Sequence, residues 1–135
     1  TLVDVFRREP KACLLGSEAL RDGVDVPGPA LRLLVSDRTP WPRPDILHKA
    51  RRDAATAAGE DRKAFDDRIA RSRRKQAYGR LIRRADDRGV FVLLDPMTPP
   101  RLLTAFPEGV PVARVGLAEA VAETEAFLAA LRAPA

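Results

Sequence analysis

The chain is 135 residues long, which predicts one domain, and 45% of its residues are apolar, enough for a small core. Its net charge of +5 is compatible with an acidic partner such as nucleic acid. The single cysteine, Cys13, excludes a disulfide framework and a metal site built from cysteines of this chain alone, and its apolar neighbours predict that it is buried. No apolar run is long enough to span a membrane and no signal-peptide pattern opens the chain, so we expect a cytoplasmic protein without a membrane partner.

In chain order, residues 2–6 predict a helix, and the chain begins inside it without an initiator methionine. We therefore expect a fragment of a longer protein. Apolar runs bounded by turn-forming residues then predict four short β-strands, at 12–15, 31–36, 90–95 and 111–115. Helical spacing of apolar residues predicts helices over 44–58, 61–85 and 117–131. Strands that alternate with helices predict an α/β fold with a mostly parallel sheet flanked by helices.

The segment 16–28 follows the first predicted strand and contains three glycines, including Gly23. Glycine permits backbone turns whose amides face an anion, and Ser17 is able to donate a hydrogen bond to a phosphate oxygen. Asp25 supplies a carboxylate between two small turns. A loop punctuated by glycine and proline but without a ligand explains the same pattern, so both interpretations stay open.

The long basic helix predicted over 61–85 carries a second candidate site. At the helical repeat, Gln76, Arg80 and Arg83 fall within about 60° of one another and share a face. Gly79 lies beside them and costs a helix roughly 1 kcal/mol relative to alanine, which suggests that a ligand comes close there. Two guanidiniums and an amide suit a phosphate chain, because each planar guanidinium binds phosphate oxygens in pairs.

A solvated basic face is the alternative for this helix. Asp86 and Asp87 would then pair with Arg83 or Arg84 at helical spacing. We expect the neighbouring basic residues to be solvated, or to contact nucleic-acid phosphates without reading sequence. They are Arg71, Arg73, Arg74, Lys75, Arg84 and Arg88.

The third candidate is the proline-rich loop 39–44, which follows a predicted strand. In an open α/β sheet ligands bind beyond the carboxyl ends of strands. Trp41 lies between two prolines and offers either a surface on which a base stacks or a side chain that packs on its own loop. Trp41 and Arg43 are thus candidate contacts to nucleic acid. His48, the only histidine, has no partner at metal-ligand spacing, so we expect a surface residue and no metal site.

These three segments, in this order, resemble the C-terminal motor domain of DinG-like helicases, which are relatives of XPD within helicase superfamily 2. The matching motifs are Gly23-Val24-Asp25-Val26-Pro27-Gly28, Pro40-Trp41-Pro42-Arg43-Pro44 and Gln76-Ala77-Tyr78-Gly79-Arg80-Leu81-Ile82-Arg83. The resemblance covers nearly the whole chain. It implies that residues 1–135 form a truncated RecA-like lobe of the P-loop NTPase type, which lacks its own first strands and the entire first lobe.

The resemblance also implies roles for individual residues. ATP and Mg²⁺ would lie in the cleft between the two lobes, mainly held by the first, and single-stranded DNA would cross both. Arg80 and Arg83 would be arginine fingers with Gln76 beside them. Gly23, Asp25 and Gly79 would contact the nucleotide. Ser17, Trp41 and Arg43 would contact DNA. The family relationship further implies 5′-to-3′ travel and a place in DNA repair.

Two features qualify the resemblance. Leu20 and Arg21 stand where the family has an aromatic pair, which puts a base contact from this turn in doubt. No phosphate-cradling Gly-Lys-Ser/Thr motif and no Asp-Glu-Ala-His motif occurs, so the chain alone should not hydrolyse ATP. Two alternatives remain, a stand-alone basic nucleic-acid-binding module and a degenerate lobe kept for protein contacts. An incomplete sheet would expose an edge, so we also expect self-association.

Overall fold

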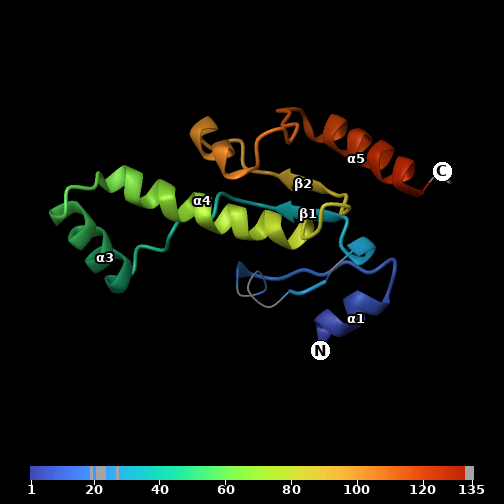
Figure 1. Ribbon diagram of the computed structural model, residues 1–135, viewed down its shortest axis with the longest axis horizontal. Coiled ribbons are helices and arrows are strands. Elements are labelled where there is room, and N and C mark those ends of the chain that lie inside the picture. The colour runs from blue at the N-terminus through green and yellow to red at the C-terminus, as the bar shows by residue number, and fades with distance from the viewer. Residues whose placement is uncertain (19, 21–23, 27, 133–135) are drawn as a thin grey trace.

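The computed structural model describes residues 1–18, 20, 24–26 and 28–132. The first and the last helix of the chain lie on opposite sides of the two strands (Figure 1). In chain order the elements are α1 (Leu2–Arg8), the 3₁₀ helix η1 (Gly28–Ala30), β1 (Leu33–Ser36), α3 (Ile46–Ala57), α4 (Arg62–Leu81), β2 (Val90–Leu93), the 3₁₀ helix η2 (Pro100–Ala105) and α5 (Leu117–Arg132).

The sheet consists of β1 and β2, which pair in parallel with Leu33 opposite Val90 and Ser36 opposite Leu93. The connection between them runs through α3 and α4, and α4 packs along the sheet (Figure 1). Parallel neighbours require such a long crossover. The predicted strands at 31–36 and 90–95 are thus confirmed with shorter ends, and so is the α/β fold with a parallel sheet.

Two predicted strands are wrong. Residues 12–15 and 111–115 have no regular secondary structure. A strand exists only where a neighbour accepts its backbone hydrogen bonds, and in the described ranges neither run has a ladder partner. Cys13, predicted to be buried, is exposed because this run does not enter the sheet.

The starts of α1, α3 and α4 follow the sequence, because each of these helices begins after a residue whose side chain caps it. Thr1 and Asp4 form a reciprocal capping box on α1, and the Thr1 hydroxyl with the N-terminal amine lowers the pKa of Asp4 to about 2. The Asp45 carboxylate accepts from the His48 amide at 2.7 Å and starts α3. Asp61 accepts from the Ala64 amide at 3.0 Å and starts α4.

The end of α4 differs from the prediction. The helix stops at Leu81, and Ile82 is extended with φ −114° and ψ 98°. The Asp87 carboxylate then accepts from the backbone amides of Arg83 and Arg84, both at 2.8 Å, which lowers the pKa of Asp87. This local closure competes with helix continuation, so the prediction of a helix to residue 85 is wrong.

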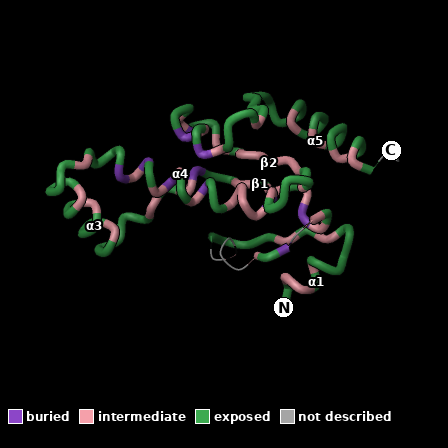
Figure 2. The backbone as a smooth tube through the Cα atoms, in the orientation of Figure 1, coloured by how far each residue is buried: buried purple, intermediate pink, exposed green. Residues whose placement is uncertain are grey.

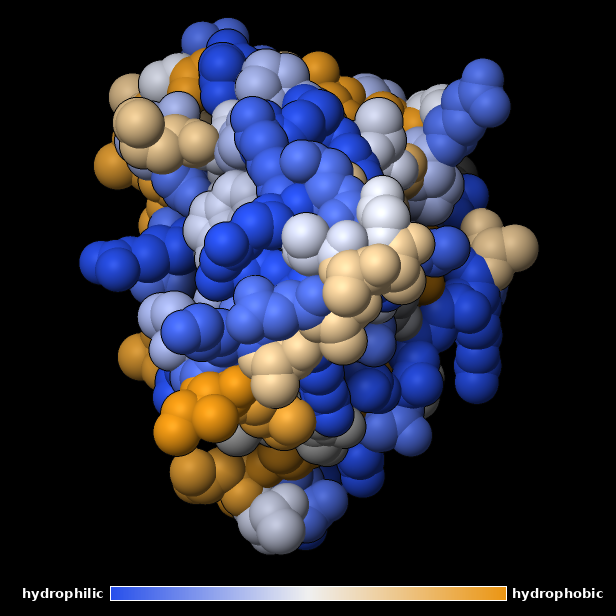
Figure 3. All heavy atoms as spheres, turned by 90° about the vertical axis from the view of Figure 1, so that its left-hand side faces the viewer, coloured by the Kyte–Doolittle hydropathy of each residue, from blue (hydrophilic) through white to orange (hydrophobic). Residues whose placement is uncertain are grey.

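The core is small and lies where α4, the sheet and the N-terminal third of the chain meet (Figure 2). Val26, Leu31 and Leu81 form its buried cluster, and Leu102 of η2 is 1% exposed. By contrast α5 keeps much of its apolar stripe in solvent, with Leu117 68% exposed. The end of the molecule where α3 lies is mostly hydrophilic (Figure 3). Among the described residues no helix is both long and apolar enough for a bilayer crossing.

Candidate functional site

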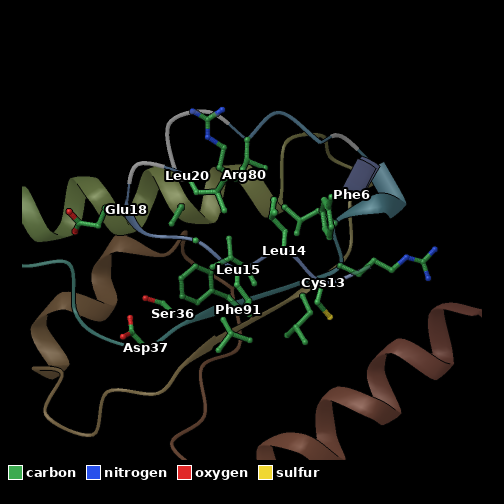
Figure 4. A pocket seen from close by; sticks show the side chains of 18 of the residues that line it. Phe6, Cys13, Leu14, Leu15, Glu18, Leu20, Ser36, Asp37, Arg80 and Phe91 are labelled. Atoms are coloured by element: carbon green, nitrogen blue, oxygen red, sulfur yellow. The ribbon is translucent and has the colours of Figure 1, made fainter. Parts of the chain in front are cut away.

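A cavity of about 980 Å³ lies between the segment 12–17, β1 and α4. Apolar side chains fill its middle, where Leu14, Leu15 and Phe91 lie close together (Figure 4). Its walls also carry charged groups, most of them guanidiniums. They are Glu18, Arg32, Asp37, Arg38, Arg43, Arg73, Arg74, Arg80 and Arg132. The cavity therefore combines an apolar floor with cations, a pairing that suits a ligand with both bases and phosphates.

Four of the predicted site residues line this one cavity. Ser17 belongs to the segment 12–17. Trp41 and Arg43 come from the loop after β1, and Arg80 comes from α4. Trp41 is 39% exposed, so part of its ring is open to a partner. In Figure 4 Arg80 lies beside Leu20 at the side of the cavity that α4 forms. Ser17 and Arg80, which are 63 positions apart in sequence, thus line the same cavity.

The predicted triad on α4 is not held together. Gln76 is exposed and lies one turn before Arg80 on α4, on the same helix face, whereas Arg83 lies beyond the end of the helix and does not share that face. A side-chain carbon added at Gly79 would meet no atom within 4 Å. Space beside Gly79 is therefore open, which agrees with a close approach of a ligand and does not require one.

Arg83 instead forms an ion pair with the Asp25 carboxylate. The same residue, Asp25, accepts a hydrogen bond at its backbone oxygen from Arg7 of α1, at 2.7 Å. Two residues predicted to face the nucleotide thus contact each other. Gly23, the third predicted nucleotide contact of this region, lies outside the described residues.

Arg74 is a functional candidate that the sequence did not single out. It is only 2% exposed, so the prediction that it is solvated is wrong. Its guanidinium donates to the Leu102 carbonyl at 3.3 Å and to the hydroxyls of Thr39 at 3.4 Å and Thr98 at 3.5 Å. Burial lowers the pKa of Arg74, and the charge of Asp95 opposes this. No sequence signal separates this arginine from its neighbours on the same basic helix.

A second network packs α3 and η2 against α4. Asp67 is 6% exposed, and both of its oxygens accept from Arg101, at 2.6 and 3.0 Å, which lowers the pKa of Asp67. His48 contacts Asp66 at 3.0 Å and lies against Phe65, with 10% of its side chain exposed. The prediction of a surface histidine is therefore wrong. Within the described ranges, no group of three metal-ligating side chains occurs.

The parallel strands, the crossover helix α4 and the arginine-lined cavity fit an α/β lobe of the RecA-like kind found in helicases. A family model described as "Helicase C-terminal domain" matches residues 1–111, so the chain belongs to this family. Its relatives make it the C-terminal domain of a DinG-like helicase. No solved structure matches the chain.

The curated relatives cover 70% of this chain. "ATP-dependent helicase DinG" of Mycobacterium tuberculosis is 41% identical over 97 residues, and "ATP-dependent DNA helicase YoaA" of Escherichia coli is 40% identical over 98 residues. "3'-5' exonuclease DinG" of Bacillus subtilis is 33% identical over 98 residues. The matched part of the chain spans 15% of the length of the first two relatives and 10% of the third.

Proposed function

We propose that this chain is the second motor lobe of an ATP-dependent DNA helicase. The cavity shared by Ser17, Trp41, Arg43 and Arg80 is the observation that carries the proposal, because it joins candidate DNA contacts to a candidate phosphate contact. The relatives named as ATP-dependent helicases support the ATP and DNA parts of it. The first lobe would hold ATP and Mg²⁺, and this lobe would complete the site.

Arg80 is the first arginine finger in this proposal. An arginine that reaches the transferring phosphoryl group stabilises its negative charge and is worth roughly 10³–10⁵ in rate. Arg83 is the second finger, and its pair with Asp25 keeps the guanidinium at the end of α4. Gln76 and Gly79 lie one turn or less before Arg80 on the same helix, where they would border the nucleotide.

Substitution of the fingers tests the proposal in the protein that joins this lobe to a first motor lobe. Arg80→Ala or Arg83→Ala should lower ATP hydrolysis by roughly 10³-fold or more while affinity for single-stranded DNA barely changes. Arg84→Ala, an exposed neighbour, is the matched control and should hydrolyse ATP normally. Loss of DNA affinity without any ATP hydrolysis to lose would instead support the stand-alone nucleic-acid-binding module.

The direction of travel belongs to the same proposal. The family resemblance implies 5′-to-3′ movement on single-stranded DNA and a role in DNA repair. A partial duplex with a 5′ single-stranded tail should then be unwound, and the same duplex with a 3′ tail should not. Equal unwinding of both substrates, or a preference for the 3′ tail, contradicts this part.

We also propose that the chain alone does not hydrolyse ATP and that it self-associates. The phosphate-cradling motif is absent from the sequence, and in the described part of the chain β1 has a ladder partner on one side only. Leu33 and Val35 of β1 are 39% and 51% exposed, which favours pairing of this edge with a second copy. Light scattering that gives the mass of a monomer at micromolar concentration would contradict self-association.

A further inference from the structure

Arg74 is a buried cation whose contacts are neutral oxygens. Within the described residues its guanidinium meets a backbone carbonyl and two threonine hydroxyls, at 3.3–3.5 Å, and no carboxylate directly. A buried charge is costly unless hydrogen bonds compensate it, so this residue ties its acceptors to α4. The acceptors belong to three separate segments, which are the loop after β1, the loop after β2 and η2.

The two threonines extend the network to an acid. The Thr39 hydroxyl donates its one proton to Asp95 at 2.6 Å, so its lone pairs accept from Thr98 and Arg74. The Thr39 amide also donates to Asp95, at 2.9 Å, and these hydrogen bonds lower the pKa of Asp95. Thr39 and Thr98 are 5% and 4% exposed, so the hydroxyls that connect Arg74 to the half-buried Asp95 are shielded from water.

Arg73, the preceding residue of α4, holds the next part of the same loop. Its guanidinium donates to the backbone oxygens of Trp41 at 3.1 Å and Pro40 at 3.4 Å, and lies 3.7 Å from the Glu18 carboxylate. Proline fixes φ, so a loop anchored at Thr39 and at the Trp41 carbonyl has little freedom between them. Two consecutive arginines therefore hold the tryptophan loop on one helix.

We propose that Arg74, assisted by Arg73, is a positioning residue that fixes Trp41 relative to Arg80 through the rigid helix α4. Arg80 lies six positions after Arg74 on the helix, about 9 Å of rise, and α4 is continuous between them. The consequence is that the DNA contact and the phosphate contact move as one body. This inference rests on the proposed function for the roles of Trp41 and Arg80, and on the network itself for the positioning.

Fluorescence of Trp41 tests the positioning directly, because Trp41 is the only tryptophan of the chain. The variants are Arg74→Met, which keeps the length of the side chain and removes its donors, and Thr39→Val, which removes the hydroxyl. Lys63→Met, at an exposed position near the start of the same helix, is the matched control. The measurements are circular dichroism for folding, quenching of Trp41 by acrylamide, and titration with an oligothymidine strand.

Arg74→Met and Thr39→Val should raise acrylamide quenching about twofold, because the loop opens more often. The half-saturating oligothymidine concentration should rise about tenfold, which corresponds to about 1.4 kcal/mol and to one lost charge-assisted hydrogen bond. Lys63→Met should behave as the unsubstituted chain. Unchanged quenching in both folded variants overturns the proposal, and if Arg74→Met does not fold, the Thr39→Val result decides alone.

Hydrolysis of ATP in the two-lobed protein separates this inference from the proposed function. Arg74→Met should raise the DNA concentration that half-stimulates hydrolysis by about tenfold and leave the KM for ATP within about twofold. A change in both constants by the same factor overturns the positioning role. If hydrolysis is insensitive to Arg80→Ala while Trp41 quenching still responds to Arg74→Met, the helicase function fails and the positioning of the loop stands.

Discussion

The Asp25 carboxylate forms an ion pair with the Arg83 guanidinium beyond the end of α4. Their side chains are 68% and 32% exposed, respectively, so solvent screens the pair. Both residues belong to motifs assigned to the nucleotide, yet their side chains pair with each other. We propose that Asp25 holds Arg83 rather than contacting the nucleotide itself.

Replacement of Asp25 by asparagine tests which of these roles it has. Asp25→Asn should change the melting temperature of the chain little, because exposed ion pairs are worth about 0–1 kcal/mol. In the two-lobed protein it should lower ATP hydrolysis about tenfold, less than Arg83→Ala, since Arg83 remains and only loses its orientation. A loss as large as that of Arg83→Ala would contradict this and indicate a direct nucleotide contact.

The Asp67–Arg101 pair should make stability depend on acid pH. The hydrogen bonds from Arg101 lower the pKa of Asp67 in the folded chain. A lowered pKa gives stability that is complete above the unfolded value of about 3.9 and is lost as pH falls through the folded value. Asp95, whose pKa the Thr39 hydroxyl lowers, contributes in the same direction.

Chemical denaturation measured at a series of pH values between neutrality and strong acid checks this. Asp67→Asn should weaken the acid dependence, and Arg101→Met should lower the melting temperature by several degrees because it leaves a buried carboxylate without its donor. Glu108→Gln, at an exposed carboxylate, is the matched control. An acid dependence that Asp67→Asn leaves unchanged would place its origin elsewhere.

The parts of this fold that the sequence predicts are those set by neighbouring residues. Asp45 and Asp61 mark the helix starts because a capping side chain reaches the amide three positions on. The parallel strands are recognisable because each is a continuous apolar run. The run at 12–15 has the same composition and is not a strand, since pairing depends on a neighbour that composition does not reveal.

The candidate site was predictable only in part for the same reason. Trp41 and Arg80 belong to recognisable motifs, and both line the cavity. The burial of Arg74 depends on Thr39 and Thr98, which lie 35 and 24 positions away and meet it only when both strands end at one edge. The end of α4 depends on Asp87, whose carboxylate accepts from the amides of Arg83 and Arg84. This contact competes with continuation of the helix, which the sequence of 82–85 also favours.

Two glycines should respond to alanine in opposite ways. Gly79→Ala places its methyl group where no atom lies within 4 Å, so it should stabilise the chain by roughly 0.5–1 kcal/mol through helix propensity. Gly89→Ala would bring its methyl group 2.6 Å from Leu81 and 2.9 Å from the Arg32 backbone oxygen. Leu81 is 3% exposed and has no room to move, so destabilisation by roughly 1–3 kcal/mol should follow.

Thermal melts of the two variants check the stabilities. The stabilised Gly79→Ala variant also probes the nucleotide, since in the two-lobed protein a methyl group at this position should raise the KM for ATP. Stabilisation together with an unchanged KM would show that the nucleotide does not approach Gly79. Equal melting temperatures for both variants would contradict the packing around Gly89.

Salt dependence should distinguish the two DNA contacts of the loop after β1. Arg43 would neutralise a phosphate, so Arg43→Ala should reduce the slope of log affinity against log salt by about 0.7 on single-stranded DNA. Trp41 would stack on a base, so Trp41→Ala should lower affinity by roughly 1–3 kcal/mol at every salt concentration and leave the slope unchanged. Trp41→Phe keeps an aromatic face and should retain most of the affinity. Fluorescence anisotropy of a labelled oligonucleotide over a series of salt concentrations measures the affinity of all three variants. If the slope falls equally in Arg43→Ala and Trp41→Ala, Trp41 acts by positioning the neighbouring cationic side chains rather than by stacking on a base.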